Sequence, residues 1–223
     1  MQARTTYFAD RRDAGRRLGA LLTGMPLHDP VVLALPRGGV PVAAEVARAL
    51  GAPWEVFVAR KVGAPGHEEY GIGAVAEGVD GDDEVVLTPD VGRLRLRPEE
   101  VGALVARQRA ELARRVRRYR AERALPEVAG RDVLLVDDGL ATGVTAEAAL
   151  RALRRRAPRR LVLAVPVCAP EARCRLEDVA DAVVCVTSPA RFLAVGAWYE
   201  DFGQTTDEEV LDLLAQATPT PGD

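Results

Sequence analysis

A single stretch, from Val133 to Thr145, constrains this chain more than any other feature of its sequence. An apolar run ends in two adjacent acids, Asp137 and Asp138, and small residues then lead into a segment that can form a helix. This order predicts a strand, a tight loop and a helix, which is the repeating unit of a parallel α/β sheet. Small residues let the amides of such a loop face a bound anion, and the helix N-terminus adds positive potential.

The side chains of this stretch suit two parts of one ligand. The hydroxyls of Thr142 and Thr145 can donate hydrogen bonds to phosphate oxygens. Paired carboxylates at the end of a strand suit ribose hydroxyls and, directly or through water, a magnesium ion. Together they predict a site for a ribose 5-phosphate. The alternative is that Asp137 and Asp138 merely end a strand and that a threonine merely caps a helix.

The remaining sequence alternates short apolar runs with longer helical patterns. This alternation predicts an α/β fold with a parallel sheet of about five strands flanked by helices. Because the runs are continuously apolar, both faces of the sheet should be buried. The expected strands are Val31–Leu35, Trp54–Ala59, Asp132–Val136, Arg160–Val165 and Ala182–Val186. The expected helices are Arg11–Leu22, Val40–Leu50, Pro98–Arg123, Thr145–Arg155, Pro170–Asp178 and Asp207–Gln216, the last capped by Thr206 or Asp207.

One segment interrupts this alternation. Residues 61–98 are rich in glycine and acids, which predicts a mobile loop followed by a short inserted hairpin. We therefore expect one domain over residues 1–217, with a lid loop and helical insertion at 61–124 and a C-terminal hood and helix at 188–217. Residues 218–223 are expected to form a disordered tail.

Two basic motifs lie near expected strand ends. Arg37-Gly38-Gly39 leads from a strand into a helix, so its backbone can approach an anion and its arginine can bind that anion in a bidentate way. Taken alone, this turn is better explained as an ordinary strand-to-helix connection. Arg60-Lys61 precedes a loop that contains glycine and proline, and Lys61 is the only lysine of the chain.

The stretch from Val133 to Thr145 resembles the fingerprint of the type I phosphoribosyltransferase family, in which two acids precede a small-Thr-Gly-x-Thr loop. The resemblance implies that the two acids bind the ribose diol. It implies that the following loop binds the 5-phosphate, through Gly139, Leu140, Ala141, Thr142, Gly143, Val144 and Thr145. Gly139 stands where the family usually has an apolar residue. Ala141 is typical of the adenine-type enzymes, whereas the 6-oxopurine enzymes carry an aspartate there.

The same resemblance assigns roles to the basic motifs. It implies that Arg37, Gly38 and Gly39 form a pyrophosphate loop. This loop is expected to contain a strained or cis peptide bond, either between Pro36 and Arg37 or between Arg37 and Gly38. It also implies that Arg60 and Lys61 neutralise departing pyrophosphate and that the following loop closes over the site as a lid. Candidates for base work in that lid are His67, Glu68, Glu69 and Glu77, although plain solvent exposure explains each of them singly better than catalysis does.

Aromatic residues gather near the C-terminus of a chain that has few of them. The family resemblance implies a hood in which Phe192 stacks on a base and Glu200 or Asp201 contacts the edge of that base. The alternative is a hydrophobic layer that seals the edge of the sheet.

Composition narrows the partners. A formal charge of −3 lacks the basic excess of a general nucleic-acid binder. No apolar run approaches the roughly 20 residues that span a bilayer, so we expect no membrane partner and a cytoplasmic location.

Cys168, Cys174 and Cys185 lack metal-site spacing, which favours buried reduced thiols. The arginine-rich stretch 107–123 is mixed with acids, which favours a solvated helix or a dimer contact over RNA binding.

The family resemblance implies a magnesium-dependent transfer of 5-phosphoribose from phosphoribosyl pyrophosphate to a nitrogenous base, and it also implies a homodimer. Asp137, Asp138, Lys61 and Arg37 are the expected catalytic residues, because they would hold charge around a transition state that resembles a ribosyl cation. The alternative is a non-catalytic regulator that senses a nucleotide or phosphoribosyl pyrophosphate on the same fold. Lys61 favours the enzyme, since a sensor has less need to stabilise departing pyrophosphate.

Overall fold

The structure of the chain, a computed structural model, describes residues 7–79, 82–121 and 123–217. The expected tail at 218–223 lies outside these residues.

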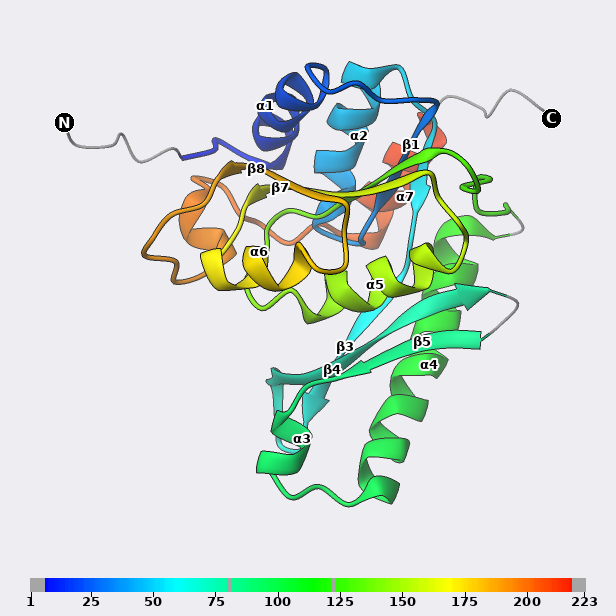
Figure 1. The fold of residues 1–223 in the computed structure, drawn as a ribbon, viewed down its shortest axis with the longest axis vertical. Coiled ribbons are helices and arrows are strands. Elements are labelled where there is room, and N and C mark those ends of the chain that lie inside the picture. The colour runs from blue at the N-terminus through cyan, green and yellow to red at the C-terminus, as the bar shows by residue number, and fades with distance from the viewer. Residues whose placement is uncertain (1–6, 80–81, 122, 218–223) are drawn as a thin grey trace.

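A five-stranded parallel sheet forms the centre of the described chain (Figure 1). Its strands, in spatial order, are β2 (Trp54–Val56), β1 (Pro30–Ala34), β6 (Asp132–Val136), β7 (Arg160–Val167) and β8 (Ala182–Thr187). Each of them overlaps one of the expected apolar runs, and β6 is buried along its whole length. The predicted fold class is therefore confirmed.

Two layers of helices cover this sheet. One layer contains α1 (Arg11–Leu22), α2 (Gly39–Leu50) and α7 (Asp207–Ala215), and the other contains α5 (Val144–Arg154) and α6 (Pro170–Leu176). Successive residues of a strand point to opposite faces, so Val32 packs in the first layer and Leu33 in the second. The continuous apolar runs of the sequence reflect this burial on both faces.

The helix starts follow from capping groups that are visible in the sequence. Asp10 accepts a hydrogen bond from the amide of Asp13 at 2.7 Å, and α1 begins directly after it. Thr206 accepts from the amide of Glu209 at 3.1 Å, while the Glu209 carboxylate accepts from the amide of Thr206 at 2.7 Å. This capping box confirms Thr206 as the N-cap of α7.

A second, antiparallel sheet extends from the core together with a long helix, and we call the two together the arm (Figure 1). It consists of β3 (Ala59–Ala64), β4 (His67–Val79), β5 (Asp82–Leu87) and α4 (Pro98–Arg120), with the short α3 (Asp90–Arg93) between the last two. The prediction that residues 61–98 begin with a mobile loop is therefore wrong, because β3 and β4 occupy most of residues 59–79.

The glycines of the arm explain this error. A Cβ atom on Gly73 would lie 2.5 Å from the carbonyl oxygen of Val86 on the neighbouring strand. Glycine is thus needed there for close packing of backbones, not for flexibility. Buried residues such as Val62, Ile72 and Val75 anchor the same strands in the core cluster on the α1–α2 side.

Glu77 joins the antiparallel sheet of the arm to the long helix of the arm, α4. Its carboxylate accepts two hydrogen bonds from Arg120 of α4, at 2.9 and 2.5 Å, and one from the amide of Val58 at 2.6 Å. Both charged side chains are buried, at 8% and 10% exposure. Burial raises the pKa of Glu77, and Arg120 opposes that rise. Glu77 is therefore a structural partner of α4 and not the lid base that the sequence suggests.

The other candidates for acid–base work lie elsewhere. His67 and Glu68 are exposed at the turn between β3 and β4. The side chain of Glu69 lies outside the described part of the chain.

Replacing Glu77 by alanine should destabilise the fold by about 3–5 kcal/mol, because it leaves Arg120 buried without its counter-charge. The measurement is the free energy of unfolding in urea, followed by circular dichroism. The matched control is the double variant Glu77→Leu with Arg120→Met, which removes both charges and should recover most of the loss. A loss below about 1 kcal/mol in the single variant would contradict this role.

Candidate functional site

Two loops meet where β1 and β6 end. The strands pair in register, with Ala34 opposite Val136, so the chain segments that leave them lie side by side. The amide of Leu35 donates to the carbonyl of Val136 at 2.8 Å. The peptide bond between Pro36 and Arg37 is cis, as the sequence analysis predicts for this loop.

The glycines of the first loop are required by this contact. A Cβ atom on Gly39 would lie 2.7 Å from the carbonyl oxygen of Val136, and one on Gly38 would collide with the carboxylate of Asp138. The structure therefore brings Gly38 and Gly39 directly against Asp137 and Asp138, as expected for parts of one site.

The two acids share a partly buried position. The amide of Asp138 donates to Asp137 Oδ1 at 2.8 Å. Burial raises the pKa of both carboxyls, and the charge of Asp138 raises that of Asp137 further. A cation beside the two carboxyls would favour their ionised forms and lower both pKa values.

Arg11 supplies one counter-charge, which sequence reasoning missed. Its Nε donates to Asp138 Oδ2 at 2.8 Å, and its Nη1 donates to the carbonyl of Gly203 at 2.6 Å. Its guanidinium also lies 3.9 Å from the ring centroid of Phe202. The one signal in the sequence is a positive charge at the first residue of a helix, where negative charge is favoured.

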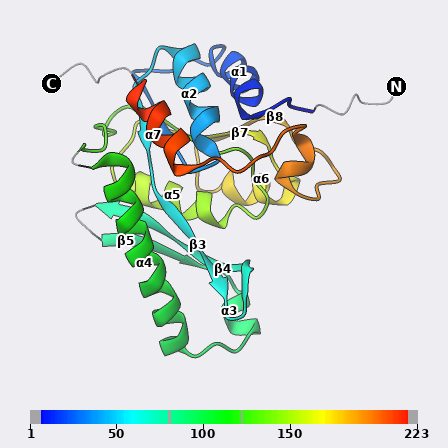
Figure 2. The ribbon, with the colours of Figure 1, turned by 180° about the vertical axis from the view of Figure 1, so that it is seen from behind.

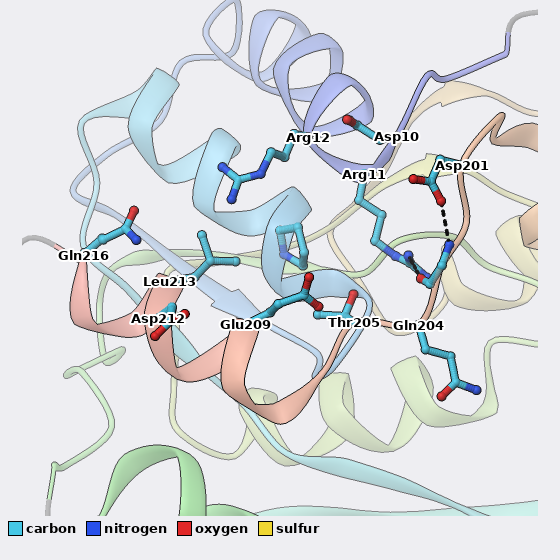
Figure 3. A pocket seen from close by; sticks show the side chains of 12 residues that line it. Asp10, Arg11, Arg12, Asp201, Gln204, Thr205, Glu209, Asp212, Leu213 and Gln216 are labelled. Atoms are coloured by element: carbon cyan, nitrogen blue, oxygen red, sulfur yellow. Dashed lines mark hydrogen bonds between the residues drawn. The ribbon is translucent and has the colours of Figure 1, made fainter.

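Arg11 separates Asp138 from a surface pocket of about 350 Å³ (Figure 3). The pocket is lined by the start of α1, by the segment 201–205 and by α7. Figure 3 shows the Arg11 side chain reaching toward that segment, beside Asp201. Asp201 accepts a hydrogen bond from the amide of Gly203 at 3.0 Å.

The loop after the acids has the backbone shape of an anion site. Gly143 has a φ of 72°, and a Cβ atom there would lie 2.9 Å from Leu176. The helix α5 begins at Val144, and no side chain of the described residues caps it. Thr142 is exposed and Thr145 is half-buried at this uncapped end. Its free amides and hydroxyls are the groups that bind phosphate at helix N-termini.

Neighbouring strands hold this loop in place. The amide of Leu140 donates to the carbonyl of Val167 at 2.9 Å, and the amide of Ala169 donates back to Leu140 at 2.8 Å. Arg175 donates to the carbonyl of Thr142. Gly139 lies beneath Val195 of the hood, where a Cβ atom would collide with that side chain.

A pocket of about 540 Å³ lies beside the loop. It is lined by Ala141, Thr142, Ala169, Glu171, Ala190, Arg191, Phe192 and Leu193. The structure thus places Phe192 next to the expected phosphate loop.

The two acids expected to contact a base do not line this pocket. Glu200 and Asp201 are exposed, and their amides donate to Phe8 and Ala9 in the N-terminal segment, at 2.8 and 2.9 Å. Asp201 lines the pocket of Figure 3 instead. The structure therefore does not bring them together with Phe192.

Arg37 of the first basic motif and Arg60 of the second lie close enough to interact electrostatically. Arg37 Nη1 lies 3.6 Å from Asp207 Oδ1 at the start of α7. Arg60 and Lys61 are half-buried in β3. Burial lowers the pKa of Arg60, and the charges of Arg115 and Arg37 lower it further.

A metal would have to share this site with a ligand. Among residues 7–79, 82–121 and 123–217, no three His, Cys, Asp or Glu side chains cluster to hold an ion. Asp137 and Asp138 offer two carboxylates with Arg11 as a counter-charge to the second, which fits a hard cation completed by ligand oxygens.

Two expectations from the composition can be compared with the structure, one on the cysteines and one on membrane-spanning helices. The three cysteines are free, but only Cys168 is buried; Cys185 is half-buried and Cys174 is exposed, so the expectation of buried thiols is wrong for Cys174. Cys174 faces solvent because its helix, α6, buries only Ala172 and Leu176. Within the described chain, no helix has the length and apolar character to cross a membrane.

Known proteins resemble this chain over most of its length. A family model described as "Phosphoribosyl transferase domain" matches residues 14–200. A protein of Mycobacterium tuberculosis H37Rv named "Putative phosphoribosyl transferase" is 44% identical over 211 residues. That match covers 94% of this chain and 47% of the relative, so the chain spans about half the length of the curated relatives it matches.

The crystal structure of TT1426 from Thermus thermophilus is similar as well. It shares 48% identity with a TM-score of 0.79, and the match covers 96% of this chain and 100% of that one. The family match spans both loops and the two acids that they bring together. The chain belongs to the phosphoribosyl transferase domain family.

Proposed function

We propose that the chain is a magnesium-dependent phosphoribosyltransferase that moves 5-phosphoribose from phosphoribosyl pyrophosphate to a nitrogenous base and releases pyrophosphate. The observation that carries the proposal is the close contact of Gly38 and Gly39 with Asp137 and Asp138, next to the uncapped start of α5. This arrangement supports one site with places for a pyrophosphate, a ribose and a 5-phosphate.

The ribose and its phosphate would occupy the second loop. Asp137 and Asp138 would accept hydrogen bonds from the ribose hydroxyls and hold magnesium directly or through water. Amides and hydroxyls from Gly139 to Thr145 would donate to the 5-phosphate. Phe192 would stack on the base in the neighbouring pocket. The base-contact role of Glu200 or Asp201 gains no support from their positions.

The pyrophosphate would occupy the first loop. The backbone at Gly38 and Gly39 would approach it closely, and Arg37, Arg60 and Lys61 would supply positive charge. Magnesium, when bound, would neutralise part of the charge on the leaving oxygens. These groups hold charge in a site partly screened from water, which lowers the barrier to a cation-like transition state. The lid role of the arm and the homodimer stay predictions.

A second function has one specific observation in its favour. Arg11 already forms an ion pair with Asp138, and both side chains are largely buried, at 12% and 15% exposure. A protein that only senses a nucleotide or phosphoribosyl pyrophosphate could keep this ion pair, because it never has to stabilise a transition state. The second candidate is therefore a non-catalytic regulator that uses the same loops.

One experiment separates the two functions. Purified protein is incubated with labelled phosphoribosyl pyrophosphate, magnesium and a panel of nucleobases, and both pyrophosphate release and binding are measured. Release with one base supports transfer. Tight binding without turnover across the panel supports the sensor, and absence of both overturns the proposal.

Lys61→Ala should reduce turnover by roughly 100-fold, because the variant loses a charge that would stabilise departing pyrophosphate. Binding of ribose 5-phosphate should stay within about threefold of the original value, which is less than 1 kcal/mol. Steady-state kinetics and calorimetry provide the two readouts. Lys61→Arg is the matched control, since it keeps the charge and should retain more activity. An equal loss of turnover and of 5-phosphate binding would contradict the assignment.

Gly143→Ala should weaken ribose 5-phosphate binding by about tenfold or more, because a left-handed residue with a Cβ atom against Leu176 costs roughly 1–3 kcal/mol in the binding loop. Gly130→Ala is the matched control, with a φ of 71° and open space around its Cβ position. Both variants are followed by thermal unfolding and by calorimetry. Similar stability losses with weakened binding only at Gly143 are expected, and unchanged binding at Gly143 would argue against this phosphate site.

A further inference from the structure

Three arginines from separate elements lie together where the arm meets the core, and we call them the junction arginines. Arg37 follows β1, Arg60 lies in β3 and Arg115 lies in α4. Figure 2 shows that α4 extends along the arm toward α7, with β3 beside it. The junction is therefore built by segments that are far apart in the sequence.

A chain of contacts fixes this junction. Tyr119 of α4 donates to Asp207 Oδ1 at 2.5 Å, and Arg37 approaches the same oxygen at 3.6 Å. Glu111, Arg115 and Tyr119 are spaced four residues apart, so they form one stripe along α4. That stripe carries Arg115 to the side of α4 that faces Arg37, and Arg115 is only 15% exposed.

The acidic side chains that contact the junction arginines also form hydrogen bonds or ion pairs with other arginines. Glu111 accepts from Arg114 at 2.7 Å and from Arg115 at 2.9 Å, and these bonds lower the pKa of Glu111 to about 2. Asp207 lies 3.2 Å from Arg118. Positive charge therefore exceeds negative charge at the junction.

Arg60 shows where that excess is uncompensated. Its Nε is buried, and it has no hydrogen-bond partner among the described residues. A half-buried guanidinium whose Nε donor is buried and unpaired, next to two further arginines, would gain from an anion that completes it. Gly38 lies directly after Arg37, so an anion there would also meet the backbone at the start of α2, where the amides of Gly39 and Val40 already donate to the carbonyls of Leu35 and Arg37.

Resting on the proposed function, we propose that Arg115 is a binding residue for the pyrophosphate group, and that the α4 insertion serves to carry this arginine into the pyrophosphate part of the site. The junction arginines would bind the two phosphates from the side opposite to Gly38 and Gly39. Arg115 would exchange part of its bonding with Glu111 for phosphate oxygens. Arginine suits this place because its planar donors match phosphate oxygens in pairs.

The test is calorimetric titration with inorganic pyrophosphate and, separately, with ribose 5-phosphate. Arg115→Gln should weaken pyrophosphate binding by about tenfold or more and leave ribose 5-phosphate binding unchanged. Arg107→Gln is the matched control on the same helix, because Arg107 is 69% exposed and contacts Glu68 at the tip of the arm. It should change neither affinity.

A second variant guards against misfolding of Arg115→Gln. Glu111→Gln keeps the charge of Arg115 but removes its acidic partner, so it should bind pyrophosphate at least as tightly as the original chain. Unchanged pyrophosphate affinity in Arg115→Gln, an equal loss in Arg107→Gln, or a loss in Glu111→Gln would each overturn the proposal.

The two ligands also separate this inference from the proposed function. Ribose 5-phosphate binding without pyrophosphate binding would overturn the role of Arg115 and leave the phosphoribosyl site standing. Pyrophosphate binding that depends on Arg115, in a chain that does not bind ribose 5-phosphate, would support the anion site and remove the phosphoribosyl assignment.

Discussion

The close approach of two loops at the ends of β1 and β6 is the constraint on which the rest of this structure depends. Parallel pairing sets the two loops side by side, and only glycine at positions 38 and 39 leaves room for the paired acids. Buried strands on both sides fix this register, because a slip of one residue would turn their apolar side chains to the wrong face. The core thus determines the geometry of the site before any ligand is considered.

Much of this could be predicted from sequence, for physical reasons. Continuous apolar runs mark strands buried on both faces, and capping residues such as Thr206 mark helix starts. The Val133–Thr145 stretch was interpretable because its order, spacing and residue types are all local. The site roles derived from it remain predictions, whereas the strand, loop and helix are observed.

The errors and omissions came from interactions between distant residues. Gly73 resembles a loop residue until the neighbouring strand is seen against it. Glu77 resembles an exposed acid until Arg120, from another element, pairs with it. Arg11 lies 127 residues from its partner Asp138. No local pattern encodes such pairs, because each depends on how the elements pack.

The contacts of Arg11 link Asp138 to two chain segments that are far apart in the sequence. Phe8 forms a β-bridge with Tyr199, and the hydroxyl of Tyr199 donates to the backbone carbonyl of Asp138. Arg11, three residues after Phe8 in the sequence, contacts the side chain of the same Asp138. The beginning of the described chain and the aromatic segment near its end therefore close over the acid as one unit. A ligand group that approached Asp138 from that side would meet both segments, so releasing Arg11 from Asp138 would disturb a contact region that the two segments share.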